Sequence, residues 1–150
     1  MSDDVLKKLN TEGIDIAPMN KRFLSYAIDE VLLSLLFVII YWDFFTTNND
    51  FEQTLQMVSS MSLQLVLLKV VYQSFFIWYY GATVGKIICK IVCIDVVMLS
   101  KPKLSTAILR AIFRIVSESF LYLGFVWALG NQLRQTWHDK IAKTVVINAY

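Results

Sequence analysis

Two long apolar runs dominate the pattern of hydrophobic and polar positions along the chain. The first begins at Phe23, and its 20 residues up to Trp42 would rise about 30 Å as a helix, the thickness of the hydrocarbon core of a bilayer. The second is interrupted by one charge, Lys69. Each run ends in a cluster of aromatic residues, which collect at the boundary between membrane and water. We therefore predict two membrane-spanning helices, at about 23–45 and 57–80.

The connection between these runs, Thr46–Gln56, contains acidic residues and turn formers but no Lys or Arg. We expect it to be a short external loop that joins the spans into an antiparallel helical hairpin. The flanking segments each carry four basic residues: Lys7, Lys8, Lys21 and Arg22 before the first span, and Lys86, Lys90, Lys101 and Lys103 after the second. Because Lys and Arg are retained on the cytosolic side, the N-terminus and both ends of the hairpin are predicted to be cytosolic.

A third helical segment is predicted at about 105–130, but it is amphipathic rather than apolar. Its charged residues Arg110, Arg114 and Glu118 recur every four positions on one stripe, as in a helix that lies partly in the headgroup plane. Only Ser119–Leu133 is free of charge, and 15 residues fall short of the roughly 20 needed to cross. We expect an interfacial helix followed by a re-entrant or short hairpin segment covered by protein, with three full crossings as the alternative.

Two segments outside the spans are candidates for strands. The region 86–98 is rich in β-branched residues, and the cytosolic tail 131–150 contains a second such run, Thr144–Ile147. The two can pair only if they lie on the same side of the membrane. Residues 1–21 lack the features of a cleaved signal peptide and are expected to form a cytosolic tail, which leaves 22–150 as the membrane domain.

Composition agrees with a membrane protein. Of the 150 residues, 57% are hydrophobic and 17% are charged, against about 45–50% and 25% in a soluble domain. A net charge of +2 is too small and too dispersed for nucleic-acid binding, and two cysteines form no disulfide framework. The predicted fold class is an all-α membrane protein: a transmembrane hairpin, an amphipathic or re-entrant third segment and a small cytosolic β element.

Charged residues inside the predicted spans are candidates for function, because an intramembrane charge is costly unless it is paired or hydrated. Arg22 and Asp29 are seven positions apart and share one helix face. Lys69 lies at a depth from which its side chain reaches toward Asp29, so we hypothesise an Asp29–Lys69 ion pair. Glu30 points elsewhere and is expected to meet Arg110 or Arg114. Along the third segment, Arg114 can also pair with Glu118 at i, i+4.

Two interpretations of these charges remain open. In one, Asp29, Glu30, Lys69 and Glu118 line a polar path on which a carboxylate binds a monovalent cation or takes up a proton. In the other, the charges neutralise one another and fix the register of the helices. A chain of this size cannot enclose a pathway alone, so transport would require a homo-oligomer or a partner membrane protein in the lipid bilayer.

Other motifs carry weaker signals. Gly81-x-x-x-Gly85-Lys86 lacks the spacing and the Ser or Thr of a phosphate-binding loop, and its glycines fit a sharp turn better. Cys89 and Cys93, with one histidine in the chain, are too few soft ligands for a metal site, so neither a metal nor a cofactor is predicted.

His138 and Asp139 are neighbours in the tail, but no serine or cysteine nucleophile is placed with them. We therefore predict no catalytic site and no enzyme. The pair is expected to form a polar latch, in which Asp139 caps the turn into Lys140–Lys143 or meets Arg110. A pH-sensing role for His138 is the alternative.

Four separated motifs, taken together, resemble the RDD family of small bacterial membrane proteins over residues 21–148. The family is named for an arginine and two aspartates, and the matching positions are Arg22, Asp29 and Asp139. Lys143 departs from the pattern, because the family more often has glycine there, before a threonine. The motifs are Arg22 with FLSYAID at 23–29, GATVGK at 81–86, Leu109-Arg110 with Arg114, and RQTWHDKIAKTVV at 134–146.

The resemblance implies a polytopic protein of the bacterial inner membrane with a part in transport of mostly unidentified ligands, and no established enzyme activity. We therefore expect a transport-related oligomer, with cation–proton exchange as the candidate reaction. The alternative is a non-transporting scaffold or assembly factor that binds a partner membrane protein.

Overall fold

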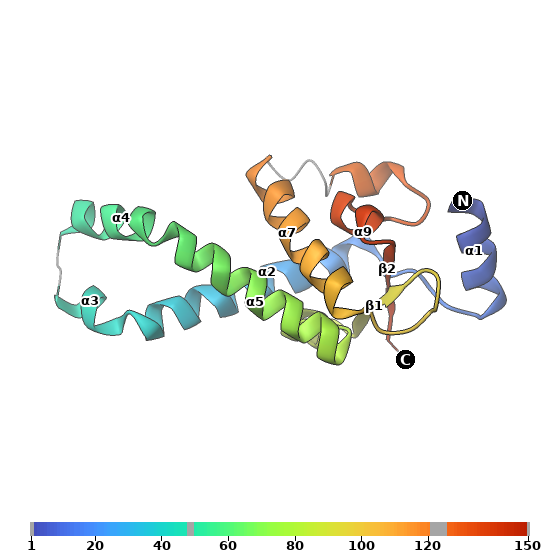
Figure 1. The fold of residues 1–150 in the computed structure, drawn as a ribbon, viewed down its shortest axis with the longest axis horizontal. Helices are drawn as coiled ribbons and strands as arrows, with labels where there is room; N and C mark the ends of the chain where they lie inside the picture. The colour runs from blue at the N-terminus through green and yellow to red at the C-terminus, as the bar shows by residue number, and fades with distance from the viewer. Residues whose placement is uncertain (1, 48–49, 121–125, 150) are drawn as a thin grey trace.

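The chain folds into a long helical hairpin joined to a smaller body that holds a two-stranded sheet and both ends of the chain (Figure 1). The computed structural model describes residues 2–47, 50–120 and 126–149. We call the smaller body, formed by described residues in 2–18 and 81–149, the foot. The end of the hairpin that lies farthest from the foot is its tip.

Each arm of the hairpin consists of two helices separated by a single residue. The first arm contains α2 (Met19–Ile40) and α3 (Trp42–Thr47), and the second contains α4 (Phe51–Ser60) and α5 (Ser62–Tyr80). The predicted bounds of the external loop, Thr46–Gln56, are therefore wrong at both ends, because α3 and α4 continue into this segment. The hydroxyl of Thr47 donates to the carbonyl of Asp43 at 2.6 Å, so a polar side chain is satisfied inside the helix rather than in a loop.

Within the described parts of the chain, two helices, α2 and α5, are long and apolar enough to cross a membrane. Only 22% of the most apolar window of each is buried inside the protein. A core helix of a soluble protein would be mostly buried, whereas these helices expose large apolar side chains to their surroundings. Examples are Phe23, Val31, Leu35 and Ile39 on α2, and Leu63, Leu67 and Val71 on α5. Both are therefore candidate membrane-spanning helices. α5 lies within the predicted range 57–80, whereas α2 overlaps the predicted range 23–45 but begins four residues earlier, at Met19.

The sheet forms as the sequence predicts. β1 (Ile91–Asp95) pairs antiparallel with β2 (Thr144–Asn148), with Ile91 opposite Asn148 and Asp95 opposite Thr144. β1 is shorter than the predicted region 86–98, because Val84–Ile88 forms the short helix α6 and the backbone N–H of Leu99 closes a turn onto the carbonyl of Asp95.

Residues 1–21 are not the simple tail that the sequence suggested. Helix α1 (Ser2–Thr11) buries Leu9 against Ile94 and Val145 of the sheet. The backbone N–H of Ala17 donates to the carbonyl of Val146, so the segment after α1 runs along β2. A sheet of two strands is marginal on its own, and this cover supplies part of its core.

Helix α7 (Leu104–Ser119) packs mainly on α5, and its charged stripe faces the protein. Arg110 is 1% exposed and Arg114 6%, whereas Leu109 and Ile112 are exposed. The prediction that this stripe faces headgroups is therefore wrong: α7 has a buried polar face and an apolar outer face.

The segment after α7 is described only in part. Residues 121–125, within the predicted re-entrant stretch Ser119–Leu133, lie outside the described residues. Helix α7 ends at Ser119. The described chain resumes with Val126 and Trp127 in helical conformation, and the 3-10 turn η1 (Ala128–Gly130) follows them before α9 (Trp137–Ile141).

Candidate functional site

Asp29 lies on α2, and its side chain is enclosed by hydrogen-bond donors from α5 and from the turn and short helix that follow it. It is 1% exposed. Its carboxylate accepts hydrogen bonds from the Tyr72 hydroxyl at 2.8 Å, the Thr83 hydroxyl at 2.6 Å and the Gly85 backbone N–H at 2.8 Å. Three donors stabilise a buried carboxylate without a cation in contact. The predicted Asp29–Lys69 ion pair is therefore wrong, because the oxygens of Asp29 are already occupied.

The two glycines of the 81–86 motif explain how these donors reach Asp29. Gly81 ends α5 in the left-handed conformation, with φ +76°, which turns the chain back as the sequence indicates. A Cβ on Gly85 would overlap the carbonyl oxygen of Ser25 and lie 2.9 Å from Asp29 Oδ1. Glycine at this position lets α6 lie directly against α2. The motif therefore serves a close helix contact, a role that sequence reasoning missed.

Four charged residues from three helices form a network near the middle of the hairpin arms, which we call the mid-span network: Glu30 on α2, Lys69 on α5, and Arg114 and Glu118 on α7. The ammonium of Lys69 lies 2.9 Å from Glu30 Oε2 and 3.2 Å from Glu118 Oε2. Arg114 contacts Glu118 at 3.1 Å and Glu30 at 3.5 Å. The Arg114 contacts agree with two of the expected pairings, whereas Lys69 has Glu30 and Glu118 as partners instead of Asp29.

The mid-span network is only partly enclosed. The side chains of Lys69 and Glu30 are 26% and 27% exposed, against 13% for Glu118. Two carboxylates and two cations make the network neutral as a whole. It therefore places partly exposed charges between α2, α5 and α7, at a position where α2 and α5 present apolar side chains outward.

A second set of charges lies at the foot, and we call it the foot cluster: Arg22, Asp29, Lys86, Arg110 and Asp139. Within it, Arg110 Nη2 lies 2.6 Å from Asp139 Oδ1, and Arg22 Nη1 lies 3.3 Å from Asp139 Oδ2. Arg22 also donates to the carbonyl of Val146 at 2.9 Å. Asp139 thus joins the start of α2 to α7 and to the sheet.

Asp139 meets Arg110, which is one of the two contacts expected of the polar latch. Its cap differs from the expected one: Asp139 accepts from the backbone N–H of Thr136 at 3.3 Å, which closes a capping box at the start of α9. Burial alone would raise the pKa of Asp139, but the charges of Arg110 and Arg22 outweigh it and hold that pKa well below its usual range. The carboxylate is therefore ionised.

His138 packs beside this ion pair, with its Nε2 2.9 Å from the hydroxyl of Thr136. Burial, assisted by the charges of Arg110 and Arg114, lowers the pKa of His138 to about 3. The ring is neutral across the physiological range. This pKa speaks against the alternative in which His138 senses pH near neutrality.

The residue of the foot cluster that sequence reasoning did not select is Lys86 on α6. It is 8% exposed, and burial together with the charges of Arg110 and Arg114 lowers its pKa to about 8. In the sequence it stands in a predicted cytosolic segment among other lysines, so no signal distinguished it.

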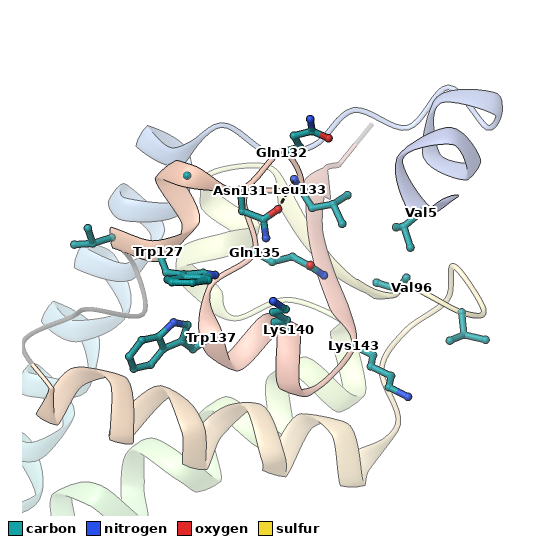
Figure 2. Close-up of a pocket in the computed structure, with 13 residues that line it drawn as sticks. Val5, Val96, Trp127, Asn131, Gln132, Leu133, Gln135, Trp137, Lys140 and Lys143 are labelled. Carbon is teal, nitrogen blue, oxygen red and sulfur yellow. Dashed lines mark hydrogen bonds between the residues drawn. The ribbon is translucent and has the colours of Figure 1, made fainter. Parts of the chain in front are cut away.

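A cavity of about 1120 Å³ opens on the foot, away from the foot cluster (Figure 2). Its wall includes Val5, Val96, Trp127 and Trp137, and Lys140 Nζ lies 5.9 Å from the centroid of the Trp127 ring. No residue of the mid-span network or the foot cluster lines it. The pocket is therefore separate from the two charged clusters.

The comparisons with known proteins agree with the motifs. A model of the RDD family matches residues 16–143, a range that contains Arg22, Asp29 and Asp139. No curated protein and no solved structure matches the chain.

Proposed function

The chain belongs to the RDD family, and from this premise we propose that it has a transport-related function in which the mid-span network exchanges a monovalent cation for a proton. Asp29, the carboxylate first expected to carry this chemistry, is assigned a structural role, because three donors occupy it. Glu30 and Glu118 are the proposed ligand carboxylates.

The position of the Lys69 ammonium carries this proposal. It lies within 2.9 Å of Glu30 and 3.2 Å of Glu118, where a positive charge between two carboxylates is favourable. In the proposed exchange, a monovalent cation and a proton bind these oxygens alternately, and each displaces the Lys69 ammonium from them. The cation leaves as the proton enters, so the local charge is the same in the two loaded states.

The proposed location is the inner membrane of a bacterium, with α2 and α5 crossing the bilayer and the foot in the cytosol. The tip region 41–61 contains no Lys or Arg, whereas the segments on either side of the hairpin are basic. Since Lys and Arg are retained in the cytosol, this distribution favours a cytosolic N-terminus.

The small number of candidate spans supports an assembly larger than one chain. A hairpin of two candidate spans cannot enclose a path for an ion by itself, so we propose that transport takes place in a homo-oligomer or together with a partner membrane protein. The partial exposure of Lys69 and Glu30 is consistent with a path completed by a neighbouring chain.

A scaffold function is the second candidate, and the pairing of the charges favours it. Each member of the mid-span network has an ion-pair partner in the same chain, and the foot cluster joins the hairpin to the sheet. Such an arrangement also suits a rigid membrane anchor that holds another protein and moves no ion.

A flux assay distinguishes the two candidates. The purified protein is reconstituted in liposomes containing a pH-sensitive dye, and gradients of sodium, lithium or potassium are imposed. We expect cation-dependent proton movement, lost in Glu30→Gln and Glu118→Gln and kept in Glu52→Gln, whose side chain is exposed at the tip. Absence of flux with every cation, from protein that remains folded, would sink the transport proposal and favour the scaffold.

A further inference from the structure

The charges of the foot cluster do not cancel. Arg22, Lys86 and Arg110 are its cations, and Asp29 and Asp139 are its carboxylates, which leaves one positive charge uncompensated. His138, their neighbour, is neutral. An isolated charge is expensive to bury, so a buried excess of this kind calls for a counter-ion.

The excess is located on Lys86. Among the described residues, no hydrogen bond or ion pair holds its ammonium, although Lys86 is only 8% exposed. The nearby carboxylates are engaged elsewhere: Asp29 by its three donors and Asp139 by two arginines.

A cavity of about 30 Å³ lies in the middle of the cluster, and Lys86 is one of the residues that line it. A space of this size holds a particle about as large as a water molecule, and it is too small for a phosphate ester. Its lining comes from α2, α5, α6, α7 and α9, so whatever occupies it touches both the hairpin and the foot.

The lining also offers N–H groups that lack an acceptor. One acceptor on the same lining, Asp139 Oδ1, also lacks a hydrogen bond but is held by its ion pair with Arg110. Arg22 Nε, Arg110 Nε and Gln73 Nε2 are buried and have no hydrogen-bond partner among the described residues. Each is a donor without acceptor capacity. An unpaired buried donor is unfavourable, so three donors beside an unpaired ammonium favour an occupant that accepts hydrogen bonds and carries negative charge.

We propose that this cavity is a binding site for a small monovalent inorganic anion such as chloride, held by the ammonium of Lys86 and the free N–H groups of Arg22, Arg110 and Gln73. The anion neutralises the foot cluster and links α5 and α6 to α2 and α7. The site adjoins the mid-span network through Arg114, which lines the cavity, but it does not depend on cation exchange there.

Thermal unfolding of the full-length protein in detergent tests the proposal. Chloride replaces gluconate at constant ionic strength and constant cation, because gluconate is too large for the cavity. Mass action predicts that Tm rises by about 3–5 °C for each tenfold increase in chloride above its Kd. Bromide and nitrate should act likewise. Lys86→Met should abolish the dependence, whereas Lys7→Met, which removes an exposed lysine, should keep it.

Gln73→Leu is the second variant, since it removes a donor and keeps every charge. We expect it to weaken chloride binding several-fold, and it remains informative if Lys86→Met fails to fold. Anomalous scattering from crystals grown in bromide should place a peak in the cavity. A Tm that is equal in chloride and gluconate, or a cavity without bromide at saturation, would overturn the proposal and identify the occupant as water.

Discussion

Arg110 of α7 and Asp139 of α9 form an ion pair with 2.6 Å between Nη2 and Oδ1, and both side chains are almost fully buried. This contact joins two segments that are distant in the sequence and fixes α7 above the sheet. Arg22 approaches the same carboxylate from α2. One aspartate therefore holds the hairpin, α7 and the tail together.

Removal of this carboxylate should destabilise the protein strongly. In Asp139→Asn, Arg110 and Arg22 lose their shared counter-charge, and breaking a buried pair from one side costs about 3–5 kcal/mol. Denaturant unfolding in detergent measures the loss. Asp43→Asn, at an exposed position of the tip, is the matched control and should change stability by less than about 0.5 kcal/mol.

The double variant Arg110→Met with Asp139→Leu refines this test, because it removes both charges. If the ion pair rather than the shape of the residues sets the cost, the double variant should lose less stability than Asp139→Asn alone. Equal losses in Asp139→Asn and in the Asp43→Asn control would show that the pair contributes nothing.

Gly85→Ala should separate α6 from α2. Its Cβ would overlap the carbonyl oxygen of Ser25, a backbone atom that cannot rotate away, and overpacking of this kind costs about 1–3 kcal/mol. The shift would also weaken the Gly85 N–H bond to Asp29. Gly130→Ala is the control, because its Cβ would meet no atom within 4 Å. Similar unfolding curves for the two variants would contradict the close contact.

Lys143→Gly should stabilise the fold. Lys143 has φ +50°, in the left-handed region where a side chain costs about 1–2 kcal/mol and glycine costs little. Glycine loses more conformational entropy on folding than lysine does, which offsets part of this gain. We therefore expect the free energy of unfolding, measured by thermal unfolding, to rise by up to about 1 kcal/mol. Lys140→Gly, inside α9, should lose stability instead.

The pH dependence of stability should carry the signature of His138. Its pKa is about 3 in the folded protein and near 6.5 in the unfolded chain. Above pH 6.5 both states are neutral and the group contributes nothing. As pH falls below 6.5, only the unfolded state binds the proton, so stability decreases by up to about 1.4 kcal/mol per pH unit.

This His138 effect can be separated from that of Asp139. The depressed pKa of Asp139 removes stability only below about pH 4, where the unfolded carboxyl takes up its proton. Between pH 6.5 and 4.5, the decrease of Tm with falling pH should therefore be smaller in His138→Gln than in the wild type. An unchanged slope in that variant would mean that another group titrates in this window.

The sequence predicted the parts of the fold that hydrophobic patterns control. The two apolar runs, the pairing of 86–98 with Thr144–Ile147 and the Arg114–Glu118 contact follow from period, composition and spacing. The partners of Asp29 could not be predicted, because two of the three, Thr83 and Gly85, come from a turn and a short helix whose position depends on the close approach of Gly85 to α2.

The direction in which the charged stripe of α7 faces is a second feature that the sequence could not predict. A period of 3.6 residues places Arg110 and Arg114 on one face, but it does not say whether that face meets water or a buried partner. Here the partners are Asp139 and Glu30, far away in the sequence. Lys86 was missed for the same reason, since its burial depends on how α6 packs.

Carbodiimide labelling of carboxylates in native membranes tests the central claim most directly. We predict that a hydrophobic carbodiimide modifies Glu30 and Glu118, that sodium or lithium in place of choline slows the modification, and that Asp29, enclosed by its three donors, stays unlabelled. Exposed Glu52 should react with a water-soluble carbodiimide at a rate that is independent of the cation. Labelling of Glu30 and Glu118 that no monovalent cation alters would contradict a cation site in the mid-span network.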